Sequence, residues 1–255
     1  MRVLFVQDSG INESLALTEL SAVLKRDRHQ THLLLADEEP RLNDAIRAWD
    51  PQLAVLPCAL RGADIVLSLA GAVRRASPDC FVLLGGTHPT FSPEIAEHPD
   101  VHAVFRGEAE GPVCALVAAL EAGADWRHLP GLAHDTASGM CINVMPPVQA
   151  DLDALPMPDR DLYFRYAFLR RFGWKKFTTG RGCVHACAFC FNTRLREMTG
   201  PDRFIRRKSP SRAVAEVAAV ARTAPLRNVH FSDDLFTWRP TWLEAFADLY
   251  PSRVG

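Results

Sequence analysis

The sequence of 255 residues has no apolar run of the roughly 18–20 residues that a membrane-spanning helix needs. It also lacks an excess of charge, because 29 Lys and Arg stand against 30 Asp and Glu. One short basic run, Arg203 with Arg206, Arg207 and Lys208, is expected to be a solvated face. The N-terminus opens into an apolar run without the architecture of a signal peptide. We therefore expect a cytoplasmic protein with no nucleic-acid and no membrane partner.

A disulfide framework is also missing. Cys58, Cys80, Cys114 and Cys141 share no spacing and lie in apolar surroundings. Such cysteines are typical of small buried side chains in a reducing compartment.

Residues 1–125 alternate short apolar runs with amphipathic stretches, and either Asn12 or Ser14 is placed to cap the first helix. Five β–α units with short connections predict a doubly wound parallel sheet, most simply of flavodoxin-like order. The expected strands are Val3–Val6, Thr31–Leu35, Leu53–Leu56, Phe81–Leu84 and Ala103–Phe105. The expected helices are Ser14–Arg26, Leu42–Trp49, Ile65–Ala76, Glu94–His98 and Pro112–Ala122.

In such a sheet, ligands bind beyond the carboxyl ends of the strands, where the strand order reverses. The loops expected there contain Ser9 and Gly10, Cys58, the run Gly85-Gly86-Thr87, and Gly107 with Glu108. A glycine directly after a strand allows a ligand close to the backbone, but it is equally typical of a simple turn. A dinucleotide is not favoured, because the sequence has no G-x-G-x-x-G motif.

The most specific motif is a cysteine triplet, C-x3-C-x2-C, formed by Cys183, Cys187 and Cys190. One folded loop can direct three thiolates at a single soft metal centre. Three protein ligands leave one coordination position open, as a catalytic site requires. The alternative is a structural zinc site with His185 as fourth ligand, although the second knuckle that is usual in zinc sites is absent.

From Lys176 the pattern is strand, cysteine loop, helix, strand and helix. The strands are expected at Lys176–Thr179 and Val229–Phe231, and the helices at Ser209–Ala221 and Thr241–Leu249. This is the opening of a parallel (β/α) barrel, whose active loops follow the carboxyl ends of its strands.

The triplet, with an aromatic residue before its last cysteine, resembles the cluster loop of radical S-adenosylmethionine (SAM) enzymes. The resemblance implies that Cys183, Cys187 and Cys190 hold a 4Fe-4S cluster whose fourth iron binds SAM. It also implies that the backbone around Phe189 faces the adenine of SAM, and that Asp233 and Asp234 contact SAM. The alternative for the aspartates is that one caps the next helical turn and the other is solvated.

The run from Gly85 to Glu110 resembles the cobalamin-binding domain that precedes many radical SAM domains. The resemblance implies a cobalamin that contacts Ser9, Gly10, Cys58, Gly85, Gly86, Thr87, Gly107 and Glu108. The D-x-H-x-x-G motif of some cobalamin domains is absent, since residues 8–13 contain no histidine. Bound cobalamin would then receive no histidine on its cobalt, and a domain that has lost the cofactor is the alternative.

These resemblances imply a cobalamin-binding domain over 1–125, a linker over 126–170 and the N-terminal part of a radical SAM barrel over 171–255, apparently truncated. They imply SAM cleavage to a 5′-deoxyadenosyl radical, with methyl transfer to an unactivated carbon or a related rearrangement. The partners would be a small-molecule or peptide substrate and a one-electron reductant such as a flavodoxin or ferredoxin. The alternative is a non-catalytic protein that binds a corrinoid or a metal.

Overall fold

The structure is a computed structural model that describes residues 1–11 and 13–254, without the side chain of Asp202. Asn12, a candidate helix cap, lies outside the described residues. The chain forms two compact units, Met1–Pro147 and Val148–Gly255. The predicted boundaries at 125 and 170 stay predictions, and the stretch expected to be a linker is divided between the two units.

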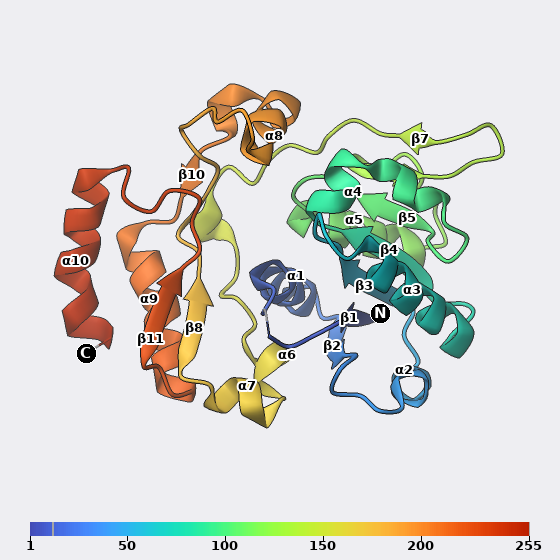
Figure 1. Cartoon of the computed structure of the whole chain (residues 1–255), viewed down its shortest axis with the longest axis horizontal. Helices are drawn as coiled ribbons and strands as arrows, with labels where there is room; N and C mark the ends of the chain where they lie inside the picture. The colour runs from blue at the N-terminus through green and yellow to red at the C-terminus, as the bar shows by residue number, and fades with distance from the viewer. Residues whose placement is uncertain (12, 255) are drawn as a thin grey trace. The chain divides into compact units, whose positions relative to one another are not determined.

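The first unit contains a seven-stranded sheet in the order β2-β1-β3-β4-β5-β6-β7 (Figure 1). The pairs among β1 to β5 are parallel, so the predicted flavodoxin-like order is confirmed. A hairpin adds two antiparallel strands at one edge. The strands are β1 (Arg2–Gln7), β2 (Gln30–Leu35), β3 (Leu53–Pro57), β4 (Phe81–Gly85), β5 (Ala103–Phe105), β6 (Leu132–His134) and β7 (Cys141–Ile142).

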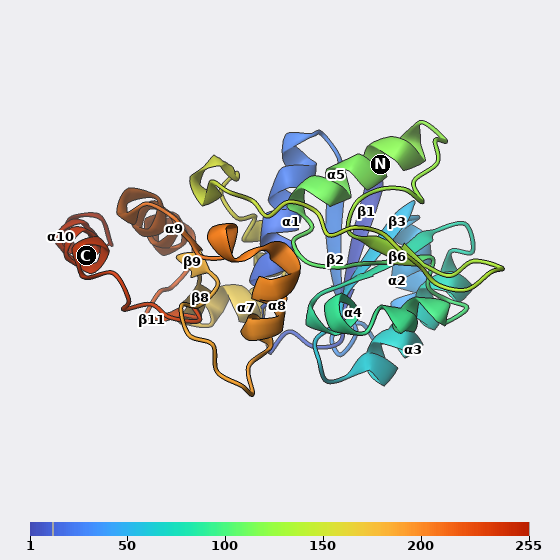
Figure 2. The same cartoon turned by 90° about the horizontal axis from the view of Figure 1, so that it is seen from above.

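Helices cover both faces of this sheet, with α1 beside α5 and α2 beside α3 (Figure 2). The Ser14 side chain caps α1 by accepting a hydrogen bond from the amide of Leu17. On the α3 side, every second strand residue joins one core with Val66, Leu69 and Val73. The helices are α1 (Leu15–Arg26), α2 (Leu42–Trp49), α3 (Ala63–Ala76), α4 (Thr87–Phe91) and α5 (Glu110–Glu121).

The helix predicted at Glu94–His98 is the main difference in this unit. The structure has α4 and then a short 3-10 turn at Pro93–Glu97. Pro93 lacks the amide hydrogen that a continuous helix requires, so it starts a new turn.

The second unit contains two parallel strands, β8 (Trp174–Phe177) and β11 (Asn228–Phe231). A short antiparallel pair, β9 (Gly180–Arg181) and β10 (Arg206–Arg207), flanks the cysteine loop. The Ser209 hydroxyl caps α9 by accepting from the amide of Arg212, and Pro210 occupies the first turn of the helix. The helices are α6 (Asp161–Phe164), α7 (Ala167–Arg171), α8 (Phe191–Thr199), α9 (Pro210–Thr223) and α10 (Pro240–Val254).

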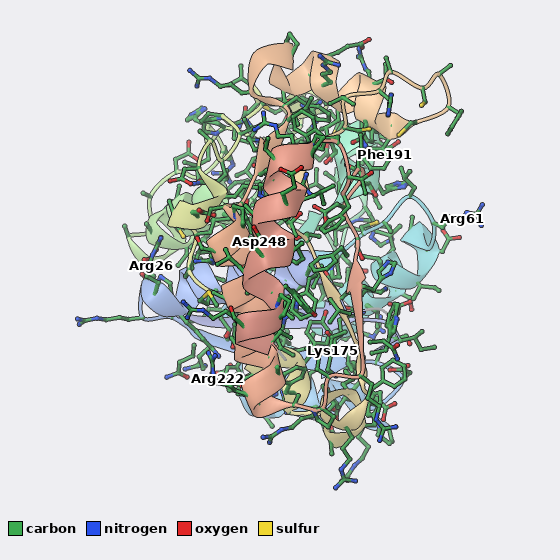
Figure 3. The ribbon with its side chains drawn as sticks, turned by 90° about the vertical axis from the view of Figure 1, so that its left-hand side faces the viewer. Arg26, Arg61, Lys175, Phe191, Arg222 and Asp248 are labelled. Atoms are coloured by element: carbon green, nitrogen blue, oxygen red, sulfur yellow. The ribbon has the colours of Figure 1, made fainter. Side chains whose placement is uncertain are left out.

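One lysine anchors the start of β8. Lys175 is fully buried, and its ammonium group donates to the carbonyl oxygens of Leu169 and Phe172 around the end of α7. It also lies 4.9 Å from the ring centre of Phe164. Lys175 and Phe191 lie toward opposite ends of this unit, so the lysine is remote from the start of α8 (Figure 3).

Within residues 1–11 and 13–254, no helix has both the length and the apolar character that crossing a bilayer requires.

Candidate functional site

The predicted ligand loops of the first unit lie along one edge of its sheet. Strands β1, β3, β4 and β5 are parallel, so their carboxyl ends share this edge, and the strand order reverses between β1 and β3. The structure therefore brings the candidate residues of all four loops to a single edge. They are Ser9, Gly10, Cys58, Gly85, Gly86, Thr87, Gly107 and Glu108.

The loops after β3 and β4 approach each other closely. The amide of Cys58 donates to Gly85 O at 2.7 Å, and the amide of His88 donates to Cys58 O at 3.1 Å. Gly86 has φ +123°, and a Cβ atom there would lie 2.6 Å from Cys58 O. Any side chain at this position would force the two loops apart. The close approach of the loops therefore requires glycine here, in addition to the turn itself.

The Cys58 thiol belongs to the core. Its side chain is 1% exposed, and burial raises its pKa to about 11. A ligand at this edge can therefore meet the backbone of Cys58 but not a thiolate.

Thr90 is a residue that the sequence did not single out. Its hydroxyl donates to Gly86 O at 2.7 Å and accepts from the amide of Gly107 at 3.0 Å. The side chain is 4% exposed, so these bonds hold the β4 and β5 loops together without contact with water. No periodicity marks such a residue, because its partners lie on two different loops.

Exposed aliphatic side chains flank the point of strand reversal. Ile11, after β1, is 84% exposed, and Leu60, after β3, is 53% exposed. Glycine backbone beside exposed apolar side chains suits the broad, largely apolar face of a corrin ring. Residues 8–13 supply no histidine for its cobalt. The edge thus fits a cobalamin held by backbone and apolar contacts.

The cysteine loop of the second unit starts from a tightly packed strand pair. Arg207 of β10 is opposite Gly180 of β9, and the amide of Lys208 donates to Thr179 O at 2.8 Å. Gly182 has φ +83°, and a Cβ atom there would overlap Phe204 O. The backbone just before Cys183 therefore has little freedom.

All three loop cysteines are free thiols, Cys187 exposed and Cys183 and Cys190 half-buried. Two hydrogen bonds order the end of the loop, from the amide of Cys190 and the hydroxyl of Thr193 to Cys187 O, at 3.0 and 3.1 Å. Across the described part of the chain, no three His, Cys, Asp or Glu side chains lie close enough together to hold a metal ion. The donor set, three thiols on one loop, suits an iron–sulfur cluster.

Phe189 is 94% exposed within this loop. A large apolar side chain left in water beside three thiols is consistent with a surface that a ligand covers. His185, the fourth ligand of the zinc alternative, is exposed on the same loop.

The two candidate aspartates differ in their surroundings. Asp233 accepts from the amide of Thr179 at 2.9 and 3.1 Å and from its hydroxyl at 2.8 Å. Burial raises the pKa of Asp233, and the hydrogen bonds from Thr179 and the charge of Arg207 oppose that rise. Asp234 is exposed. Contact of either residue with SAM stays a prediction.

The prediction that the basic run is a solvated face is wrong for Lys208 and Arg207. Lys208 is 3% exposed and pairs with the buried carboxylate of Glu216 at 2.8 Å, which also accepts from Arg212 at 2.8 Å. The guanidinium of Arg207 stacks on Trp242, 3.8 Å from the ring centre. These acidic and aromatic partners come from α9 and α10, so the composition of the basic run alone could not reveal them.

Residues 1–117 match the family model described as the B12 binding domain. An uncharacterized methyltransferase of Pyrococcus horikoshii is 28% identical over 198 residues, which cover 75% of this chain and 41% of the relative. A hopanoid C-3 methylase of Methylococcus capsulatus is 27% identical over 188 residues, 70% of this chain and 35% of that protein. The chain thus spans less than half the length of these curated relatives.

The fold also matches a solved structure of the radical SAM methyltransferase TsrM from Kitasatospora setae, with cobalamin and a [4Fe-4S] cluster bound. The TM-score is 0.75 at 16% identity, and the match covers 97% of this chain and 50% of TsrM. The architecture of this chain is therefore a mostly parallel sheet in the part that matches the B12 binding domain, followed by a second α/β unit, and TsrM shares this fold.

Proposed function

We propose that this chain is the cofactor-binding part of a cobalamin-dependent radical SAM enzyme. Such an enzyme cleaves SAM and transfers a methyl group to an unactivated carbon, or carries out a related radical rearrangement. The proposal is supported by the match of residues 1–117 to the B12 binding domain and by the similarity to methyltransferases and to the fold of TsrM. The observation that carries this proposal is the C-x3-C-x2-C loop, which follows a parallel strand of one unit, while the other unit matches the B12-binding domain.

In the proposed site, Cys183, Cys187 and Cys190 hold a four-iron cluster through their thiolates. When bound, such a cluster supplies the electron that splits SAM into methionine and a 5′-deoxyadenosyl radical. The backbone around Phe189, a residue that is 94% exposed, faces the adenine. The acidic pair Asp233 and Asp234 lies at the carboxyl end of β11, where negative charge complements a sulfonium. Because Asp233 is engaged with Thr179, Asp234 is the aspartate that is free to turn toward SAM.

The edge of the first unit binds cobalamin through the backbone of the β3 and β4 loops and through Ile11 and Leu60. When bound, cobalamin supplies a carrier for the methyl group. Thr90 keeps the β4 and β5 loops at one spacing. No histidine of residues 8–13 is available, so we expect cobalamin with no protein histidine on cobalt.

The substrate is proposed to be a small molecule or peptide, and the electron donor an external flavodoxin or ferredoxin. The cysteines that the structure describes are all free, which is consistent with a reducing compartment such as the cytoplasm.

The test is to purify the chain without oxygen, determine its iron, cobalt and zinc, and incubate it with SAM and dithionite. We expect iron after reconstitution, uptake of added hydroxocobalamin, and formation of 5′-deoxyadenosine. Stoichiometric zinc with no bound iron would support the metal-binding alternative instead. Bound cobalamin without any iron would support a corrinoid-binding protein.

A further inference from the structure

Three polar side chains meet at the base of the cysteine loop. Thr179 follows β8, four residues before Cys183, and is 1% exposed. Its hydroxyl donates to Asp233 at 2.8 Å and accepts from Nη2 of Arg207 at 3.2 Å. The hydroxyl proton therefore has one orientation, toward the carboxylate. Thr179 is the link between an acidic and a basic side chain that form no direct ion pair of their own.

These side chains come from separate parts of the second unit. Asp233 follows β11 and lies 54 residues from Thr179, while Arg207 belongs to β10. Arg207 is also the register partner of Gly180, the next residue after Thr179. A Cβ atom on Gly180 would lie 2.8 Å from Arg206 O and 3.5 Å from a carboxylate oxygen of Asp233. The network thus joins both strands that flank the cysteine loop to the end of β11.

Arg207 occupies its place at an energetic cost. Its guanidinium stacks on Trp242 and lies 5.3 Å from the ring centre of Phe236. Nε and Nη1 are buried and have no acceptor among the residues that the structure describes, while Nη2 bonds to Thr179 and to Phe236 O. An apolar side chain would pack between the rings without leaving buried donors unpaired. Stability alone therefore does not account for an arginine here.

The opposite end of the loop is ordered as well, by the bonds of Cys190 and Thr193 to Cys187 O. The ends of the loop are thus held by hydrogen bonds on both sides of the cysteine triplet. A fixed starting point favours metal binding, because ordering the loop around a metal costs less conformational entropy when fewer residues have to be fixed.

We propose that Thr179, Asp233 and Arg207 are positioning residues that fix the backbone leading into Cys183 before any metal binds. The step that concerns cluster binding rests on the proposed function, whereas the order of the metal-free loop does not.

The test compares Thr179→Val, which keeps the shape of the side chain and removes its hydroxyl, with Thr179→Ser, which restores it. Thr223→Val is the matched control, because the Thr223 hydroxyl bonds only to carbonyl oxygens of its own helix. Hydrogen exchange by mass spectrometry is measured on the metal-free chain, and bound iron is measured after anaerobic reconstitution.

We expect the peptide over residues 180–190 to exchange at least about fivefold faster in Thr179→Val, because the variant loses both bonds of the hydroxyl and one hydrogen bond contributes about 1 kcal/mol net. Iron per chain should fall in the same variant. Thr179→Ser should return both values to those of the wild type, and Thr223→Val should leave both unchanged. Exchange in Thr179→Val at the wild-type rate would overturn the inference.

Arg207→Met provides a second variant in case Thr179→Val does not fold. It removes the bonds to Thr179 and Phe236 but keeps an apolar contact with Trp242. We expect the same local acceleration with a melting temperature near that of the wild type, a combination that a purely structural role would not give. Slower or unchanged exchange would contradict the inference. If the loop responds as expected but the chain binds zinc alone, the proposed function fails and the positioning network stands.

Discussion

Replacing Gly182 with alanine tests how strictly the start of the cysteine loop is defined. Gly182 directly precedes Cys183 and has φ +83°, and a Cβ atom there would overlap Phe204 O. A side chain at positive φ costs about 1–3 kcal/mol. Overlap with a backbone atom that cannot rotate away adds about 1–3 kcal/mol. We expect Gly182→Ala to destabilise the second unit by about 2–6 kcal/mol, against the about 5–15 kcal/mol typical of a folded domain.

Gly200→Ala is the matched control in the same unit. Gly200 has φ +90°, and no atom of the described residues lies within 4 Å of the place that a Cβ atom would take, so only the backbone cost applies. The assay is hydrogen exchange of the β11 and α9 amides at increasing urea, which reports the opening free energy of this unit. Iron content after reconstitution is measured in parallel. If Gly182→Ala is no more destabilising than Gly200→Ala and loads as much iron as the wild type, the start of the loop is not constrained by Gly182.

Three further predictions follow from the two sites. Cys187→Ala should abolish iron binding and SAM cleavage. The control variant Cys141→Ala, which lies outside the loop, should retain iron. SAM cleavage by the Cys187 variant would contradict the assignment of the cluster ligands. Burial raises the pKa of Asp233 above its usual value of 3.8, so the folded chain binds this proton more tightly than the unfolded chain does. The free energy of unfolding should therefore fall as pH rises from 3.8 through the raised pKa. Urea unfolding over this range should show the slope flattened in Asp233→Asn and kept in Asp234→Asn; an unchanged slope in the first variant would contradict the assignment. The Cys58 thiol is 1% exposed, and burial raises its pKa to about 11. At pH 8 it should therefore resist iodoacetamide, while the exposed Cys187 reacts. Equal labelling of the two cysteines, measured by mass spectrometry, would contradict the burial of Cys58.

The sheet of the first unit was predictable because its strands are short apolar runs between amphipathic helices. Ala103–Phe105 and Leu42–Trp49 were predicted with the bounds that the structure has. The region after β4 was not, because Pro93 divides it into two short turns that have no helical periodicity of their own.

The cysteine triplet was predictable because its three residues lie close together in the sequence. The contacts that support them were not. Thr90 and Thr179 act through single hydroxyls, and Thr179 meets Asp233 across 54 residues. Arg207 was predicted to lie on a solvated face, whereas in the structure its guanidinium stacks on Trp242 of α10. Sequence periodicity reports which face of an element is buried, and it does not report which polar groups meet when elements pack.

The most direct test of the central claim is electron paramagnetic resonance on the anaerobically reconstituted, dithionite-reduced chain, recorded with and without SAM. We expect the signal of a reduced 4Fe-4S cluster that changes when SAM is added, because three cysteine ligands leave one iron open. A chain that carries stoichiometric zinc and gives no cluster signal would contradict it.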